Sequence, residues 1–146
     1  MVRGAGRFKK ALAAVLCLVL IGLLVGCSNG KLPDGMEEDD LIARAKAAGD
    51  ALVARDYEAF LEMFPKDGRG DLTVEVLASY YDPVLDALGT GGRYSNVAVG
   101  PYTDADGTQY GVVLVEQMFA KGSMNHTATF AEGPQLIGFI RTDRDA

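Results

Sequence analysis

The chain has 146 residues, with 14 Lys and Arg against 20 Asp and Glu, and a formal net charge of −6. Such an acidic balance argues against nucleic-acid binding, because phosphate recognition needs clustered Lys and Arg. The length suits one domain of ordinary size built around a single hydrophobic core. We therefore expect one domain and no nucleic-acid partner.

Residues 1–26 have the organisation of an export signal. A basic head containing Arg3, Arg7, Lys9 and Lys10 precedes an uninterrupted apolar run at 11–26. A charged head, an apolar stretch and small residues at its end are typical of a secretory signal. The alternative is an uncleaved anchor helix, which the length disfavours because a membrane-spanning helix needs roughly 20 residues.

The signal ends on Leu24-Val25-Gly26-Cys27, which resembles the cleavage motif of bacterial lipoproteins. This resemblance implies that the chain is cut before Cys27, which is then diacylated and becomes the mature N-terminus. Two acyl chains hold a protein firmly on a bilayer, whereas one holds it only weakly. We therefore expect a palmitate-type lipid anchor on Cys27 and a location on the extracytoplasmic face of the cell membrane.

The exported part contains no further cysteine, since Cys17 lies within the signal. It can form no disulfide and must be stable through packing alone. Residues 27–40 contain Gly, Pro, Asn and Asp and predict a flexible tether, whose acidic end at 37–40 resembles the solvated start of a helix. A single His leaves only carboxylates as further metal ligands, so we expect no metal and no cofactor.

Three helical segments are expected at the start of the domain. Apolar residues recur at helical spacing over 41–52. Asp56 predicts the N-cap of a second segment, and Thr73 that of a third. Pro83 predicts a bend or break within the third segment, because proline removes a backbone hydrogen bond, and Gly89 predicts its end.

From Gly91 the apolar period changes to two, which predicts strands at 94–99, 108–121, 124–131 and 135–141. Short turns between successive strands predict an antiparallel meander. Residues 112–115 are all apolar, which predicts a strand covered on both faces. The fold class is therefore α+β, with helices packed on one face of a curved sheet over residues 41–142.

The turn before the second strand contains Asp104-x-Asp106-Gly107, which resembles the start of a calcium loop. It lacks the third acid and the distal Glu that such a loop needs. Asp and Gly in this order are also typical of a β-turn, which is the interpretation we prefer.

The order of motifs resembles a known family. They are Asp56-Tyr57-x-x-Phe60, Phe64, Leu72-Thr73, Val113-x-Val115, Phe119-x-Lys121-Gly122, Phe130 and Ile137-x-Phe139. This pattern is similar to the bacterial domain-of-unknown-function family 3887, which has the cone-shaped nuclear transport factor 2-like fold. The resemblance implies a cone-like fold and an exported setting, and it implies no reaction.

Cone folds enclose a pocket between the concave sheet and the helices, which in related families holds steroids or other small molecules. Such pockets are mostly apolar with a few placed polar groups. The candidate lining residues here are Phe60, Phe64, Tyr81, Glu116, Phe119, His126 and Phe130. The alternative is that the aromatic side chains simply fill the core.

We expect a non-enzymatic module that binds a small apolar ligand or a protein, with a homodimer formed through the exposed sheet face. The alternative is a ketosteroid-isomerase-like enzyme in which His126, Glu116 or Tyr81 moves a proton. A third interpretation is a structural spacer with a filled cone. Convergence of these polar groups in a cavity would distinguish the enzyme from the other two.

Overall fold

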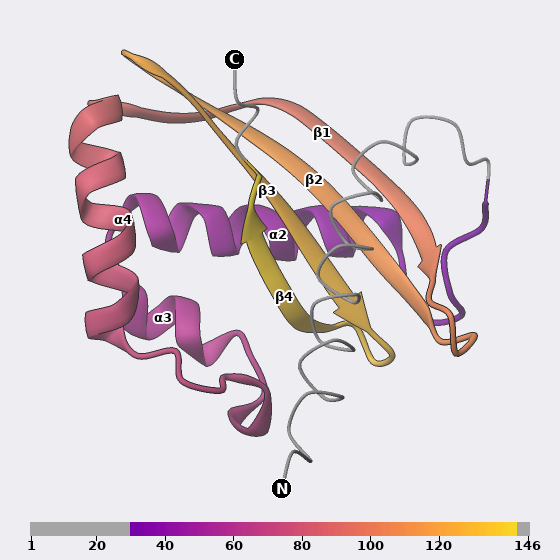
Figure 1. Ribbon diagram of the computed structural model, residues 1–146. Helices are drawn as coiled ribbons and strands as arrows, with labels where there is room; N and C mark the ends of the chain where they lie inside the picture. The colour runs from indigo at the N-terminus through magenta and orange to yellow at the C-terminus, as the bar shows by residue number, and fades with distance from the viewer. Residues whose placement is uncertain (1–29, 143–146) are drawn as a thin grey trace, which may run out of the picture.

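A row of helices leads into an open sheet in the computed structural model, which describes residues 30–142 (Figure 1). The helical elements are α2 (Glu38–Val53), α3 (Tyr57–Glu62), the 3₁₀ turn η1 (Lys66–Gly68) and α4 (Val74–Leu88). The strands are β1 (Gly91–Thr103), β2 (Gln109–Phe119), β3 (Gly122–Ala131) and β4 (Gln135–Arg141). The expected signal peptide at 1–26, Cys27 and the first residues of the tether lie outside the described residues.

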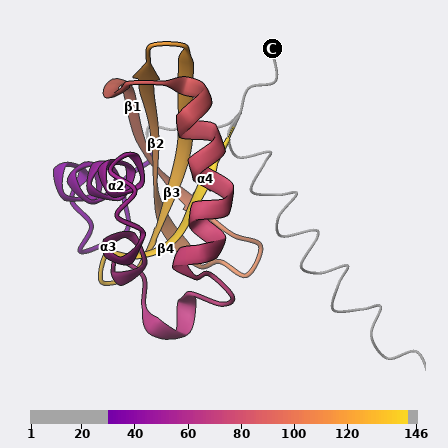
Figure 2. The ribbon, with the colours of Figure 1, turned by 90° about the vertical axis from the view of Figure 1, so that its left-hand side faces the viewer.

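The strands pair in the order β1-β2-β3-β4, and each is antiparallel to its neighbour. Figure 1 shows α2 running across one face of this sheet, and Figure 2 shows α3 on the same side. The α+β class and the antiparallel meander are therefore confirmed. Within the described residues, no helix is both long enough and apolar enough to cross a membrane.

The predicted helix caps are confirmed. The Asp56 carboxylate accepts a hydrogen bond from the Ala59 amide at 3.1 Å, and the Thr73 hydroxyl accepts one from the Val76 amide at 3.2 Å. Gly89 ends α4 with a φ of 76°, a conformation that favours glycine. Helices α3 and α4 therefore begin, and α4 also ends, where the local chemistry satisfies free backbone groups.

Pro83 does not divide α4, which continues through it to Leu88. Proline removes the amide that would bond to the Ser79 carbonyl. Both Pro83 and Ser79 are exposed, so water can satisfy that carbonyl. The predicted break is absent because the lost bond lies on the solvent side of the helix.

The corner between α2 and α3 is fastened to α4 by a polar cluster. The Tyr57 hydroxyl donates a hydrogen bond of 2.6 Å to Asp82, and Arg55 lies 3.1 Å from the same carboxylate oxygen. Burial and the Asp82 carboxylate raise the pKa of Tyr57 above its ordinary value. This cluster holds α4 against the corner between α2 and α3, so that Tyr81 reaches the sheet.

The ordered domain begins earlier than the expected boundary at Leu41. Helix α2 starts at Glu38, and the acidic residues of the expected tether form its first turn. Met36 is 6% exposed and belongs to the core, against which Leu32 also packs. The part of residues 27–40 that the structure describes is therefore largely part of the domain.

Gly111 on β2 explains this early start. A Cβ atom at Gly111 would lie 2.6 Å from Leu41 Cδ1, 2.9 Å from Met36 Sδ and 3.8 Å from Leu32 Cδ2. The missing side chain thus leaves a notch in the sheet that these three apolar side chains occupy. The Met36 amide also donates to the Pro33 carbonyl at 3.1 Å, which closes a turn ahead of α2.

Strand β1 is longer than predicted, since it runs from Gly91 to Thr103 and includes Pro101. Pro101 lies beyond the strand predicted at 94–99. It is accommodated because β1 is an edge strand, where a residue without an amide hydrogen is tolerated. Two register irregularities, at Gly91/Arg93 and Tyr94/Asn96, let β1 follow β2 along its length.

The sheet face away from the helices carries several apolar side chains. Met118, Ile137 and Ile140 are exposed at 38%, 41% and 47%. Val112 is only 1% exposed, and Leu114 is half-buried. The prediction that residues 112–115 are covered on both faces therefore holds for most of the run.

Helix α2 approaches the sheet closely at Gly49. A Cβ atom there would lie 2.6 Å from the Tyr94 hydroxyl and 3.1 Å from Gln117 Oε1. The Tyr94 hydroxyl is held in place, because it donates to the Lys46 carbonyl at 2.6 Å and lies 2.9 Å from an Asp50 oxygen. Glycine is thus required at the point where the helix crosses β1 and β2.

We predict that Gly49→Ala lowers the free energy of unfolding by about 1–3 kcal/mol, because the added methyl group overpacks this contact. The gain in helix propensity, about 1 kcal/mol, is smaller than the cost of displacing the bonded Tyr94 hydroxyl. Urea denaturation measures the change. In the background of Tyr94→Phe, which removes the obstructing hydroxyl, the same substitution should cost less. Equal costs in both backgrounds would contradict the proposed contact.

Candidate functional site

The structure brings four of the predicted pocket residues together in the core. Tyr81 Oη lies 3.3 Å from His126 Nε2. The His126 ring stacks on Phe139 at 4.5 Å, and Phe139 meets Phe60 edge-on at 5.6 Å. Phe60 in turn packs edge-on against Phe64 at 5.2 Å. These side chains touch one another between α3, α4 and the last two strands.

Glu116 does not join this group. Its neighbours Val115 and Gln117 face the core, so the alternation of the strand directs Glu116 to the opposite face of the sheet. There it accepts a hydrogen bond of 2.9 Å from the Ser95 hydroxyl. The sheet therefore separates Glu116 from His126, and the two cannot act as a proton-transfer pair.

Phe119 and Phe130 lie at opposite ends of the inner sheet face. Phe119 ends β2 and is 8% exposed. Phe130 is near the end of β3, pairs with Gly111 and is fully buried. Among the predicted lining residues, Phe130 borders a cavity.

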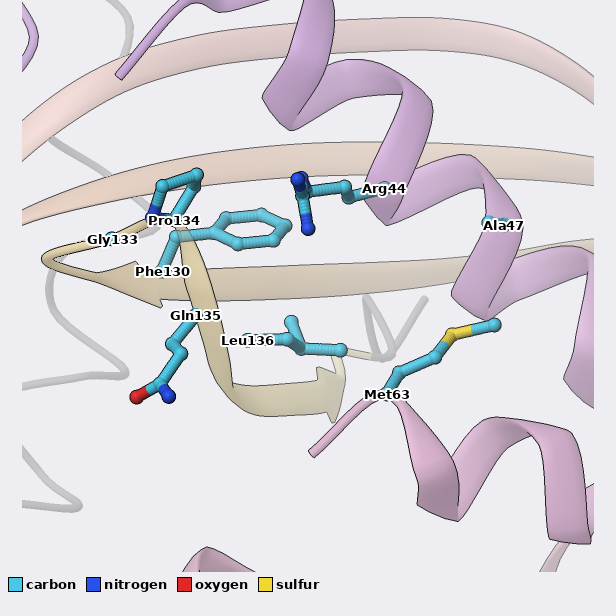
Figure 3. Close-up of a pocket in the computed structure, with 8 residues that line it drawn as sticks. All are labelled: Arg44, Ala47, Met63, Phe130, Gly133, Pro134, Gln135 and Leu136. Atoms are coloured by element: carbon cyan, nitrogen blue, oxygen red, sulfur yellow. The ribbon is translucent and has the colours of Figure 1, made fainter. Parts of the chain in front are cut away.

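That cavity, here called the α2 pocket, lies between α2, the end of α3 and the turn from β3 to β4 (Figure 3). Its volume is about 230 Å³. Helix α2 contributes Arg44 and Ala47, and Met63 comes from the end of α3. The remaining lining residues are Phe130 on β3 and the turn and strand residues Gly133, Pro134, Gln135 and Leu136.

The α2 pocket combines an apolar floor with a cationic rim. Phe130 and Leu136 are 0% and 4% exposed, and they form the floor. Arg44 is half exposed and donates from Nε to Asp40 at 2.8 Å. Figure 3 shows its guanidinium group extending from α2 towards the ring of Phe130. Arg44 thus pairs with Asp40 and lines the pocket at the same time.

The chemistry of this lining suits binding rather than reaction. Its polar side chains are one guanidinium and one amide, and it includes no carboxylate, imidazole, thiol or hydroxyl side chain. In the described part of the chain, no cluster of three or more His, Cys, Asp or Glu residues could hold a metal ion. A molecule with an apolar body and an anionic or acceptor group would match floor and rim together.

A second, more open cavity of about 560 Å³ lies on the other side of the β3–β4 turn. Pro33 and Asp34 line it from the N-terminal segment, and residues 107–110 line it from the β1–β2 turn. The lining is completed by Ala131 at the end of β3, Glu132 in the β3–β4 turn and Ile137 on β4. We refer to it as the turn-end cavity.

The β1–β2 turn is built around Asp104. One oxygen of its carboxylate accepts the Asp106 and Thr108 amides at 2.9 Å each, and the other accepts the Tyr110 hydroxyl at 3.0 Å. The Gly107 amide donates to the Asp104 carbonyl at 3.1 Å, which closes a β-turn. The predicted β-turn is thus confirmed, and its carboxylate is engaged within the turn.

Partial burial raises the pKa of Asp104, but the hydrogen bonds from Thr108, Tyr110 and Asp106 outweigh it and hold the pKa below its ordinary 3.8. A carboxyl group with a lowered pKa in the folded state contributes stability above its unfolded pKa, and this is lost as the pH falls. We therefore predict that Asp104→Asn reduces the amount of stability that is lost as the pH falls from about 4 to about 2. Thermal unfolding across this range measures that loss. An equal loss in the variant and the parent protein would contradict the role of the Asp104 charge.

Comparisons with known proteins inform the fold alone. No protein-family model matches the sequence, and no curated protein matches it. The fold is similar to that of the "NMR structure of protein from Ruminococcus gnavus ATCC 29149", with a TM-score of 0.63 and 23% sequence identity. The similarity covers 75% of this chain and 95% of that chain.

Sequence reasoning missed most of the α2 pocket. Arg44 and Ala47 are three residues apart and therefore share one helix face, which is a usable signal. Met63 and the β3–β4 turn give no such signal, because only the packing of α3 against the strand ends brings them to α2. The sequence pattern identified the aromatic core correctly but did not show where that core leaves a hollow.

Proposed function

We propose that the protein is a lipid-anchored extracytoplasmic binding module, and that its α2 pocket holds a small molecule with an apolar body and an anionic end. The observation that carries the binding function is the pairing of an apolar floor with the Arg44 guanidinium in one cavity. The motif ending on Cys27 supports the anchor and the location at the membrane.

The size of the pocket limits its ligand. A volume of about 230 Å³ equals that of roughly eight water molecules in the liquid. This is below the range typical of drug-sized ligands, so a medium-chain acid such as octanoate fits and a steroid does not. Burying the apolar end supplies affinity, while a charge-assisted bond to Arg44 orients the ligand.

For the fold, we propose membership of the cone-shaped nuclear transport factor 2-like class and kinship with family 3887. The order of helices followed by an open antiparallel sheet supports this proposal. The packing motifs of the family also occupy structural positions here, since Phe60, Val113, Val115 and Phe130 are all core residues.

The ketosteroid-isomerase-like alternative has less support. Its Tyr81–His126 contact exists, but Glu116 is on the other face of the sheet and neither described cavity is lined by Tyr81 or His126. A homodimer through the outward sheet face stays a prediction, for which the exposed Met118, Ile137 and Ile140 provide the apolar surface.

We predict that octanoate binds the α2 pocket and shifts the NMR signals of Ala47 and Met63. Arg44→Met should weaken binding about tenfold or more, since it removes a charge-assisted hydrogen bond. Ala47→Phe should abolish binding by filling the cavity, while Arg93→Met, an exposed arginine on β1, serves as the matched control. An equal loss of octanoate affinity in the Arg44 and Arg93 variants would contradict the site. NMR signal shifts spread over the whole surface would contradict it as well.

We predict that Cys27→Ser releases the protein from the membrane fraction, because the acyl chains would have no attachment point. Cell fractionation with mass spectrometry of the N-terminus measures both location and lipid. Cys17→Ser is the control, because that residue lies within the signal and should have no effect. A Cys27→Ser protein that still sediments with membranes after its signal has been removed would refute the lipid anchor.

A further inference from the structure

The domain starts very close to its expected point of attachment. Leu32 and Met36 are packed into the Gly111 notch. Only residues 28–31 therefore separate Cys27 from the first residue that packs against the domain. A fully extended chain over these five steps spans at most about 18 Å.

The point of attachment lies at one end of the sheet. Figure 1 shows the segment before α2 beside the β1–β2 turn, on the opposite side from α4 and the β2–β3 hairpin. Pro33 and Asp34 share the turn-end cavity with Thr108 and Ile137. Lys121, in the β2–β3 hairpin, is separated from Thr108 by the 11 residues of β2, which is about 35 Å of strand.

We infer that this end of the domain faces the bilayer and that its surface, formed by residues 33–34, the β1–β2 turn and the start of the β3–β4 turn, rests on the lipid headgroups. This orientation rests on the proposed acylation of Cys27. The tether is too short to let the β2–β3 hairpin approach the membrane instead. The partner that contacts this surface is thus the headgroup layer of the bilayer that holds the lipid anchor.

The charges of this surface favour one type of headgroup. Asp34, Asp106 and Glu132 are exposed there, and Tyr110 presents a half-buried ring beside them. Carboxylates attract the ammonium groups of zwitterionic lipids and are repelled by anionic lipids within about 10 Å at ordinary ionic strength. Tyrosine is also favoured at a membrane interface, since one end of its ring is apolar and the other polar.

The orientation also brings the α2 pocket towards the membrane. Ala131 and Glu132 border the turn-end cavity, and the next two residues, Gly133 and Pro134, border the α2 pocket. The two cavities therefore share the β3–β4 turn.

The test uses the acylated protein in phosphatidylcholine vesicles that contain a lipid with a nitroxide on its headgroup. An environment-sensitive fluorophore is attached to Thr108→Cys or, as the matched position, to Lys121→Cys. In the acylated chain Cys27 carries lipid, so each introduced cysteine is the sole free thiol. We expect the label at 108 to lose most of its emission and the label at 121 to lose almost none.

A flexible Gly/Ser insertion of about 12 residues after Gly30 should release the constraint, because it raises the fully extended reach of the tether to about 60 Å, which exceeds the length of β2. Quenching at 108 should then fall towards the level at 121. Equal quenching at both positions in an acylated protein without the insertion would overturn the orientation alone. Absence of an acyl group on Cys27 by mass spectrometry would overturn both the proposed anchor and the orientation.

Discussion

The positions of α2 and of the α2 pocket depend on one contact, the packing of the N-terminal segment against Gly111 on β2. Three apolar side chains occupy the space that a side chain at position 111 would fill, and they fix where α2 begins. Helix α2 then crosses the sheet at Gly49 and presents Arg44 to the β3–β4 turn. One small residue on β2 thereby sets both the start of the domain and the position of its pocket.

Much of the fold follows from local patterns in the sequence. The caps at Asp56 and Thr73 and the stop at Gly89 depend on neighbouring backbone groups, so they can be read residue by residue. The errors have a common cause. The continuity of α4 through Pro83 and the extension of β1 through Pro101 depend on which side of an element faces water or a partner strand, and local propensity does not record that.

The candidate site is harder to predict, because a cavity is a property of packing. Apolar spacing places Phe60, Phe64 and Phe130 in the core without showing which of them borders empty space. His126 illustrates the same limit. Strand alternation correctly places it on the inner face, yet only the three-dimensional contacts show that it stacks on Phe139 and meets Tyr81 within the core. The opposite orientation of Glu116, by contrast, follows directly from the period of the strand.

The packing of Met36 against Gly111 is the most direct point at which to test this account, because the start of the folded domain and the placement of α2 both depend on it. Nuclear Overhauser contacts in the soluble domain from Ser28 onward measure it. We expect a strong contact between the Met36 methyl group and the Gly111 α-protons, together with slow hydrogen exchange of the Met36 amide bonded to Pro33. Absence of that contact, with a Met36 amide exchanging as fast as in an unfolded chain, would contradict the account.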